Sequence, residues 1–473
     1  MISILYDNYS YDETLITNKT FSDLRLSNLL DQNAQQIISK KCTSHDIALR
    51  QEIFDCINDS NECKWFSECY NKLIVFDKYH SMLCDKTMTN LERAFIFLVY
   101  VEAYEDFLKH LSHGNSAYFF SRLSNNAYKS IEKLNKFSPE IEKYRLIAER
   151  YRNIVVNNIG QIELPQYCED NSFVSEIVHC SLVMECEATV PRFRPVRIDP
   201  SMSASVECFC GDDFIALVDI QKTVLPHIDV EYLCLKSEMA FYISINNLRK
   251  QLEYIGIPSC IPTISVDPQY KACELYDITM SNELGNQIVP NDISLETNSS
   301  TCFIKGVNGG GKTSFLRAVA INLIFFISGC PVYCRSAQIY PFSDIHVLFQ
   351  DAETFLEGGR LLSEQQRVDV AVRGRSSKTF VFINEMFSST DDVTGTLKSI
   401  ETMNKLSSVG GFCLFVTHFE TLESTHHSMY AILGADGKPT YRITREDSMA
   451  VSSTYNVLKK YNLDREYIMR LIQ

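Results

Sequence analysis

A glycine-rich segment that ends in lysine and threonine is the part of this 473-residue chain whose residues most directly indicate chemistry. It reads Gly306-Val307-Asn308-Gly309-Gly310-Gly311-Lys312-Thr313 and fits the pattern G-x-x-x-x-G-K-[ST]. Residues 301–305 before it predict a strand, and residues 314–320 after it predict a helix. Glycines let backbone N–H groups turn inward around a polyphosphate, and a helix N-terminus adds partial positive charge. The segment therefore predicts a nucleotide phosphate site; the alternative is a glycine-rich turn with a chance lysine.

Three side chains at the end of this segment have expected roles. Lys312 is expected to reach the β- and γ-phosphates, and Thr313 to hold Mg²⁺ through its hydroxyl. Ser314, which opens the expected helix, is counted with them as a nucleotide-binding residue. The expected ligands are ATP and Mg²⁺.

An apolar run over 379–383 ends in two polar residues, Asn384 and Glu385. Such a run predicts a buried parallel strand whose C-terminal end carries chemistry. A magnesium-associated carboxylate often occupies the first position; the amide of Asn384 can hold a water on Mg²⁺ but brings no charge. Glu385 is well placed to be the general base that deprotonates the attacking water.

A second run of this type covers 412–416 and is followed by Thr417 and His418. His418 is a candidate sensor of the γ-phosphate, and the alternative is a capped loop residue at a strand end. Between the two runs, Gly358 and Gly359 precede Arg360 and a polar helical stretch. This predicts a second anion-friendly helix start, which in a two-site ATPase would close on the nucleotide of the partner subunit.

Composition limits the class of protein. The net charge of −14 argues against a protein that coats nucleic acid, although a local basic patch remains compatible with it. Arg192, Arg194 and Arg197 form one such cluster, which either contacts a phosphate backbone or is a solvated loop. The 17 cysteines show no zinc-ribbon spacing and are expected to be free thiols. The N-terminus lacks a signal-peptide pattern and no apolar run is long enough to span a membrane, so we expect a cytoplasmic protein, or a nuclear one in a eukaryote, that is not secreted.

The first part of the chain is expected to be mainly helical. Apolar residues at spacings of three and four between Phe97 and Leu111 predict an amphipathic helix that stops near Gly114, and a second helix is expected from Ser138 to about Arg152. The run 214–218 predicts a strand or a short buried segment. We therefore expect a helical region over 1–267, subdivided near 158, and an ATPase domain over 268–473 in which strands and helices alternate.

The downstream part resembles the MutS family of mismatch-repair ATPases, which have an ABC-type fold. The segment 289–295, the loop Asn308–Thr313, the pairs Asn384-Glu385 and Thr417-His418, and Pro331-Val332 occur in the family's order. Residues 452–468 are similar to the family's closing helices. The resemblance covers roughly 270–473 and extends weakly back through 238–265. It implies an α/β P-loop NTPase domain of the ABC/MutS type, preceded by a core- and lever-like helical region.

The chain departs from the family pattern at several positions. The family's aromatic that stacks on adenine falls near Ile288, so Ile288 and Val289 would pack on the base without π-stacking. The serine of the family's signature segment falls near Arg360, so its contact to the γ-phosphate in the partner is either lost or made by arginine. The family's mismatch-reading domain has no counterpart in the pattern, and we expect a short form.

Two functions follow from these residues and the resemblance. The first is a MutS-like ATPase that binds and hydrolyses Mg-ATP, dimerises with itself or a related chain through its ATPase domains, and acts on DNA or in a DNA-processing complex. The second is an ATP-gated switch for a protein partner with slow or no hydrolysis, favoured by Asn384 and Arg360. A phosphate-loop kinase is the third class, and nothing in the sequence resembles its acceptor site or lid.

Overall fold

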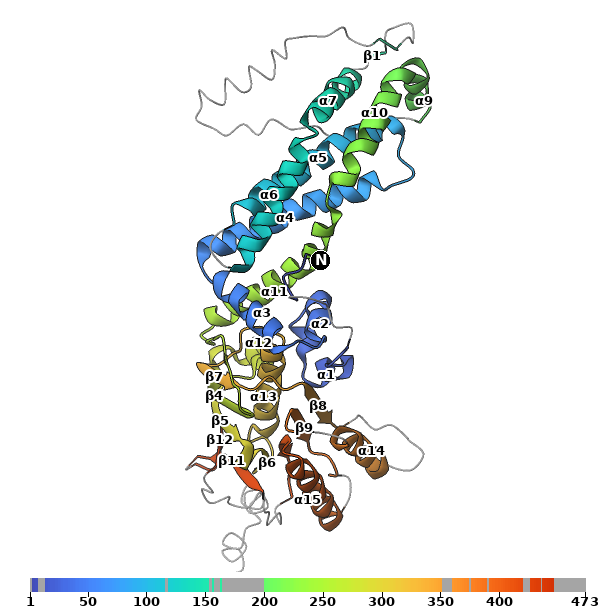
Figure 1. The fold of residues 1–473 in the computed structure, drawn as a ribbon. Coiled ribbons are helices and arrows are strands. Elements are labelled where there is room, and N and C mark those ends of the chain that lie inside the picture. Colours follow the sequence, from blue (N-terminus) through green and yellow to red (C-terminus); the bar gives the residue numbers. More distant parts are fainter. Residues whose placement is uncertain are drawn as a thin grey trace, which may run out of the picture. The chain divides into compact units, whose positions relative to one another are not determined.

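The computed structural model describes residues 2–6, 13–114, 118–152, 155–156, 162–163, 200–350, 360–373, 376–388, 391–419, 426–434 and 436–445. The chain forms two compact units (Figure 1). The first comprises Met1–Ser3 and Asp59–Met239, and the second comprises Ile4–Asn58 and Ala240–Gln473. The second unit therefore begins earlier than the boundary expected at 268, at Ala240, and it also includes the N-terminal segment Ile4–Asn58.

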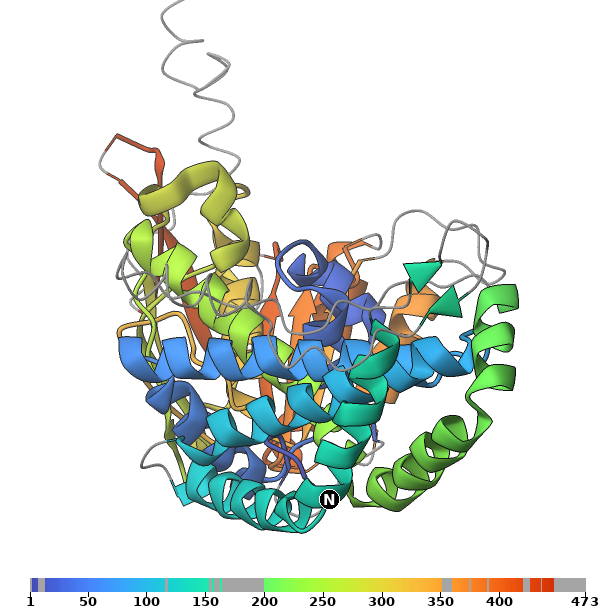
Figure 2. The same cartoon turned by 90° about the horizontal axis from the view of Figure 1, so that it is seen from above.

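The first unit is mainly helical in its described part. Neighbouring helices α4 to α6 lie side by side in both cartoon views (Figures 1 and 2). Its elements are α4 (Ser60–Leu83), α5 (Asn90–Ser112), α6 (Tyr118–Asn135), α7 (Ser138–Arg152), β1 (Val155–Val156), β2 (Ile162–Glu163), α9 (Pro200–Phe209), α10 (Gly211–Val224), η2 (Leu225–His227), η3 (Val230–Cys234) and the start of α11 (Leu235–Tyr254). The expected helices over 97–111 and 138–152 are confirmed as parts of α5 and α7.

The run 214–218 is helical, so its interpretation as a strand was wrong. It lies inside α10, where Phe214, Leu217 and Ile220 are buried while Ile215 is 63% exposed. Burial at every third or fourth residue is the pattern of a helix with one apolar face. The five consecutive apolar letters concealed this pattern, because two of them point to solvent.

The N-terminal segment of the second unit is held by a buried arginine. It contains α1 (Asn18–Asp23), η1 (Leu26–Asn28), α2 (Gln32–Ile38) and α3 (Ser44–Cys56). Arg50 of α3 is fully buried and donates hydrogen bonds to the carbonyl oxygens of Leu5 (3.1 Å) and Ser328 (3.0 Å). Because a buried guanidinium needs such partners, this contact ties the segment to the end of the helix that follows the glycine-rich loop.

A six-stranded sheet forms the centre of the second unit. Its order is β12-β11-β6-β10-β9-β8, with β12 antiparallel to β11 and the other neighbours parallel. The strands are β6 (Thr301–Lys305), β8 (Asp344–Phe349), β9 (Thr379–Asn384), β10 (Phe412–Val416), β11 (His427–Leu433) and β12 (Pro439–Thr444). The predicted strands over 301–305, 379–383 and 412–416 are confirmed, and every residue of β10 is buried.

Helix α13 (Lys312–Ile327) packs against this sheet and is buried along its length from Phe315 to Ile327. The Tyr270 hydroxyl, from a second sheet, donates to the carbonyl of Val319 on the same helix (3.3 Å). That sheet has the order β3-β7-β4-β5, with β3 (Thr263–Ile264), β4 (Gln269–Leu275), β5 (Asn291–Glu296) and β7 (Ser336–Ile339). Short turns of helix lie between β4 and β5, namely η4 (Ile278–Met280), α12 (Ser281–Leu284) and η5 (Gly285–Gln287), and η6 (Thr297–Ser299) connects β5 to β6 of the central sheet.

Helices α14 (Arg360–Val372) and α15 (Asp392–Ser408) contribute to a hydrophobic core with the central strands. Val381, Ile383 and Phe415 belong to this core, together with Val368 of α14 and Met403 of α15. The second unit is therefore a layered α/β structure, with C-terminal ends of parallel strands gathered at one edge. Among the described residues, no helix is both long and apolar enough to cross a membrane.

Candidate functional site

The glycine-rich loop connects the central strand β6 to the buried helix α13, as its sequence predicted. Gly306 has a φ of +118°, and a Cβ there would come within 3.0 Å of the Cβ of Ala431 on β11. Gly311, directly before α13, has a φ of +91°. Only glycine adopts these backbone angles readily, so the loop can curve tightly over the start of the helix. Its N–H groups and the helix N-terminus then form an anion-friendly end.

Lys312 lies across its own loop and is 4% exposed. Its ammonium donates to the carbonyls of Gly306 (2.6 Å) and Val307 (3.1 Å) and to Oδ1 of Asn308 (3.4 Å). Burial of the ammonium lowers the pKa of Lys312, while the nearby Glu385 carboxylate acts in the opposite direction. A desolvated cation aimed at the loop is suited to an anionic ligand that supplies the missing countercharge.

The structure brings the two candidate metal-associated residues together. The Thr313 hydroxyl donates to Oδ1 of Asn384 at 3.0 Å, although the two residues are 71 positions apart in sequence. Thr313 is the second residue of α13 and Asn384 is the last residue of β9, so the contact forms where the strand ends meet the helix start. This edge is the position at which parallel α/β sheets bind ligands.

Glu385 and His418 follow neighbouring strands but take different places. Glu385 lines the cavity at the loop and has a φ of +54°. His418 is exposed, its ring lies against that of Phe419 (4.5 Å between centroids), and it is absent from the lining of that cavity. In this arrangement His418 does not line the cavity, so the structure gives no support to its predicted role at the γ-phosphate.

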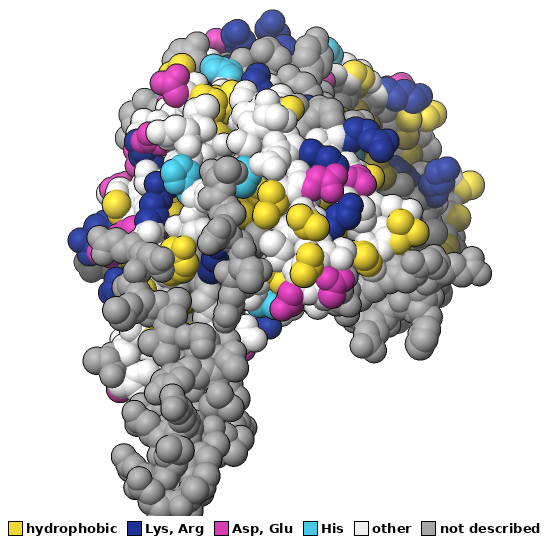
Figure 3. Space-filling model, turned by 90° about the horizontal axis from the view of Figure 1, so that it is seen from below, with side chains coloured by type: hydrophobic (Ala, Val, Ile, Leu, Met, Phe, Trp, Pro, Cys, Tyr) yellow, Lys and Arg dark blue, Asp and Glu magenta, His cyan; other side chains and the backbone are white. Residues whose placement is uncertain are grey.

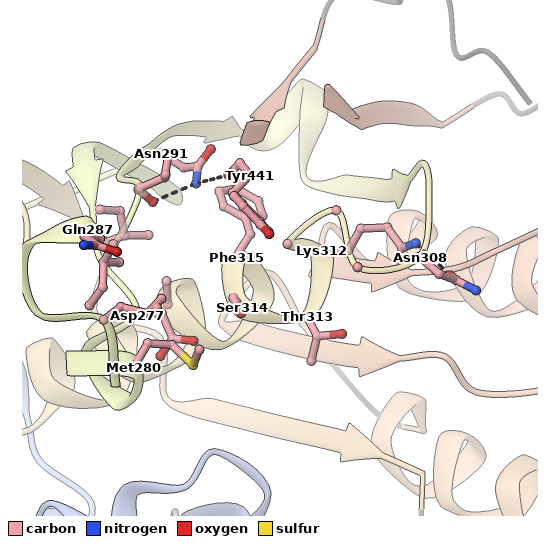
Figure 4. A pocket seen from close by; sticks show the side chains of 18 of the residues that line it. Asp277, Met280, Gln287, Asn291, Asn308, Lys312, Thr313, Ser314, Phe315 and Tyr441 are labelled. Carbon is pink, nitrogen blue, oxygen red and sulfur yellow. Dashed lines mark hydrogen bonds between the residues drawn. The ribbon is translucent and has the colours of Figure 1, made fainter. Parts of the chain in front are cut away.

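A cavity of about 700 Å³ adjoins the loop. Figure 4 shows Lys312 and Thr313 at one end and Gln287, Asp277 and Met280 at the other. Of the candidate nucleotide-binding residues, those that line it are Ile288, Val289, Asn308, Gly309, Gly310, Gly311, Lys312, Thr313 and Ser314. A cavity of this size, with the glycine-rich loop at one end and both apolar and polar side chains at the other, suits a drug-sized ligand such as a nucleotide.

Tyr441 of β12 also lines the cavity, and the sequence contained no signal for it. Its carbonyl accepts a hydrogen bond from the Asn291 amide (3.1 Å), drawn in Figure 4, and the Asn291 Oδ1 accepts from the Ile443 N–H (2.7 Å). Asn291 lies within the segment 289–295 that carries the family resemblance. These two hydrogen bonds hold β12 against β5. They bring the aromatic ring of Tyr441 to the cavity, which Ile288 lines with an aliphatic side chain.

A buried ion pair forms part of the cavity wall. Asp277 is 4% exposed and pairs with Arg317 of α13, with 3.1 Å between Oδ2 and Nη1. Burial raises the pKa of Asp277, while Arg317 and the hydrogen bonds from Thr279 act in the opposite direction. The pair joins the turn after β4 to the helix that begins at the glycine-rich loop.

Several predicted residues lie outside what the structure describes. Gly358 and Gly359 are not described, and Arg360 is described only as the first residue of α14. Arg192, Arg194, Arg197 and residues 452–468 are also outside the described residues. In the described part of the chain, no three His, Cys, Asp or Glu side chains gather to hold a metal. Its cysteines are free thiols, as expected.

Part of this α/β unit is similar in sequence to proteins of known family. Residues 302–467 match the family model described as MutS domain V. A DNA mismatch repair protein, MSH3 of Scheffersomyces stipitis, is 25% identical over 179 residues, which is 37% of this chain and 18% of that protein. The endonuclease MutS2 of Maridesulfovibrio salexigens is 28% identical over 137 residues, covering 28% of this chain and 18% of that protein.

A further relative is the DNA mismatch repair protein MSH6 of Saccharomyces cerevisiae, 26% identical over 199 residues, or 37% of this chain and 16% of that protein. The matches thus span less than a fifth of each of these three relatives. Residues 302–467 are therefore a MutS domain V segment, and it is through this segment that the chain is similar to the MutS family.

Proposed function

We propose that this protein is a MutS-like ATPase that binds Mg-ATP in the cavity beside the glycine-rich loop and hydrolyses it. The observation that carries the proposal is the Thr313–Asn384 hydrogen bond (3.0 Å), formed at the edge of a cavity lined by both Lys312 and Glu385. Four residues from two distant parts of the sequence thereby meet in the arrangement that phosphoryl transfer uses.

Each side chain has a separate task at the phosphate end. The Lys312 ammonium exchanges its loop carbonyls for phosphate oxygens, and the backbone N–H groups of Gly309 to Gly311 add hydrogen bonds to the same oxygens. The Glu385 carboxylate orients a water and removes its proton as the water attacks the γ-phosphorus. The γ-phosphoryl bond to the β-phosphate oxygen then breaks and releases ADP and phosphate.

The donor set at Thr313 and Asn384 fits Mg²⁺. A hydroxyl and an amide oxygen, both neutral, leave room for the phosphate oxygens and waters that complete its six ligands. Bound there, Mg²⁺ would neutralise charge on the phosphates. Thr313 would be the direct protein ligand, and Asn384 would hold a coordinated water.

The part of the cavity away from the glycine-rich loop would hold the adenine. Ile288 is 8% exposed and provides an aliphatic contact, and Tyr441 provides a ring that can stack on the base. Tyr441 thus supplies the aromatic contact that Ile288 lacks.

The test is nucleotide binding and turnover by the full chain and two variants. Lys312→Ala should weaken binding of a fluorescent ATP analogue roughly 10- to 100-fold, because charge-assisted hydrogen bonds contribute about 1.5–3 kcal/mol. Glu385→Gln should keep binding and lower turnover at least about 100-fold, the contribution expected of a general base. Unchanged binding in Lys312→Ala would overturn the proposal.

The alternative is an ATP-gated switch that binds nucleotide but hardly turns it over. Two observations favour it: the uncharged Asn384 stands at the metal-associated position, and His418 lies away from the cavity lining. Tight ATP binding by the wild-type chain with undetectable hydrolysis would establish the switch and exclude the ATPase.

For partners, we propose that the chain dimerises through its second unit and that its ATP-driven conformational change acts on DNA, by analogy with relatives named as DNA mismatch repair proteins. On the face in Figure 3, Lys and Arg side chains are interspersed with acidic and hydrophobic ones, so the proposal of a DNA partner rests on the relatives and not on a basic patch of this face. DNA affinity that falls steeply with salt would support the DNA partner, and size measurement with ATP would test the dimer. A cytoplasmic or nuclear location accords with such a role.

A further inference from the structure

The backbone directly after β9 has an unusual conformation. Glu385 has a φ of +54° and Phe387 a φ of +68°, and neither is glycine. The left-handed conformation costs an ordinary residue about 1–2 kcal/mol, so two such residues within three positions persist only where the surroundings hold them. The residue whose conformation is held in this way is the candidate general base.

Contacts from neighbouring elements hold this segment. The Glu385 N–H donates to the carbonyl of Val416 at 3.0 Å, and the Gln350 amide donates to the carbonyl of Glu385. The Phe387 side chain is fully buried in the core between the sheet and α14. The Phe387 N–H donates to Oε2 of Glu364 on α14 at 2.8 Å.

Glu364 lies on the buried face of α14, which otherwise contributes apolar side chains to the core. It is 3% exposed, and the residue one turn later, Val368, is 1% exposed within the core. Burying a carboxylate there is costly unless hydrogen bonds compensate it. An apolar side chain would fill this position without desolvating a carboxylate, so packing alone does not explain the glutamate, and its hydrogen bond to the Phe387 N–H gives it a part in holding the strained segment.

We propose that Glu364 is a positioning residue for Glu385, acting through the N–H of Phe387. If Phe387 lost this acceptor, its backbone could relax from the left-handed region, which would rotate the Met386–Phe387 peptide and move the Glu385 carboxylate away from its place in the cavity. Displacement of a catalytic group by about 1 Å can lower the rate about 100-fold. The inference rests on the proposed function, which gives Glu385 the role of base.

Two substitutions separate positioning from folding. Glu364→Met removes the acceptor but keeps the volume; because it leaves the buried Phe387 N–H without this acceptor, some loss of stability is expected, and activity is compared under conditions where urea unfolding shows the variant to be folded. Glu364→Gln keeps an oxygen that can accept from Phe387. Gln366→Ala, on the exposed face of the same helix, is the matched control.

The readouts are kcat, KM for ATP, and hydrogen exchange of peptides covering 380–388. We expect Glu364→Met to lower kcat roughly 10- to 100-fold with KM changed less than about twofold, and to speed exchange at 385–388. Glu364→Gln should recover most of the rate and the protection, and Gln366→Ala should match the wild type.

The results distinguish this inference from the proposed function. If Glu385→Gln abolishes turnover but Glu364→Met retains it, or if Glu364→Gln is as slow as Glu364→Met, positioning is overturned while the proposed function stands. If turnover does not depend on Glu385, the assignment of the base fails and the inference fails with it.

Discussion

Replacing Asn384 by aspartate should change how this site uses Mg²⁺. Asn384 Oδ1 accepts from the Thr313 hydroxyl at 3.0 Å, and a carboxylate oxygen can accept the same bond without rearrangement. The substitution therefore adds one negative charge at nearly constant shape. The metal requirement, rather than the fold, is what this charge should alter.

The magnitude follows from the geometry. Mg²⁺ keeps its ligands at about 2.0–2.1 Å, so a metal on Thr313 would lie within about 5 Å of Asn384 Oδ1. A unit charge at about 5 Å from a divalent ion gains about 1.7 kcal/mol even with the dielectric constant of water, which is about 20-fold in affinity. Salt screening reduces the gain, so we expect the Mg²⁺ concentration for half-maximal ATP binding to fall about 5- to 20-fold.

The assay is a Mg²⁺ titration of ATP-analogue binding, with turnover measured in parallel. Affinity for the nucleotide in EDTA should not improve, because the new carboxylate repels the phosphates. Asn298→Asp adds the same charge at an exposed position near the opposite end of β6 and is the control. An unchanged Mg²⁺ requirement in Asn384→Asp, or an equal shift in the control, would refute the placement of the metal beside Thr313.

Three further predictions concern the second unit, whose unfolding can be followed by hydrogen exchange of peptides from β9 and β10 in a urea titration. Arg317→Met should destabilise it by about 3–5 kcal/mol, because Asp277 is left as an unpaired buried charge; a loss under about 1 kcal/mol would contradict this. Gly395→Ala should destabilise it by about 1–3 kcal/mol, since a Cβ there would lie 2.2 Å from Cζ of Phe419, and a smaller side chain at 419 should restore part of the loss. Burial lowers the pKa of His426, so the unfolded chain binds its proton more readily and stability should decline as pH falls through the unfolded value of about 6.5; His426→Gln should flatten that decline, and an unchanged pH profile would count against it.

The part of the site at the glycine-rich loop could be predicted because its residues form short contiguous sequence motifs. The loop from Gly306 to Thr313 and the strand ends at Asn384 and Glu385 are local patterns, and the structure places them at one edge of the sheet. The base end could not be anticipated in the same way. Tyr441 belongs to a strand that pairs antiparallel at the sheet edge, and only the bonds of Asn291 to that strand bring its ring to the cavity.

The helical part shows the limit of local pattern. Spacings of three and four residues predicted α5 and α7, whereas the apolar run 214–218 was ambiguous until its neighbours were known. Which residues of such a run are buried depends on the helices that pack against it. The segment 4–58 is a similar case, because the partners of Arg50 at Leu5 and Ser328 are 45 and 278 positions away.

The sequence by itself predicted the nucleotide site, the central parallel strands and the likeness to the MutS family, since each prediction depends on residue types at short, fixed spacings. Only the tertiary structure decided which side chains share the cavity, that His418 lies outside its lining, and that Glu364 of α14 reaches the backbone beyond Glu385. The physical reason is that backbone conformation follows from neighbouring residues, whereas burial, ion pairing and hydrogen bonding between distant segments exist only once the chain has packed.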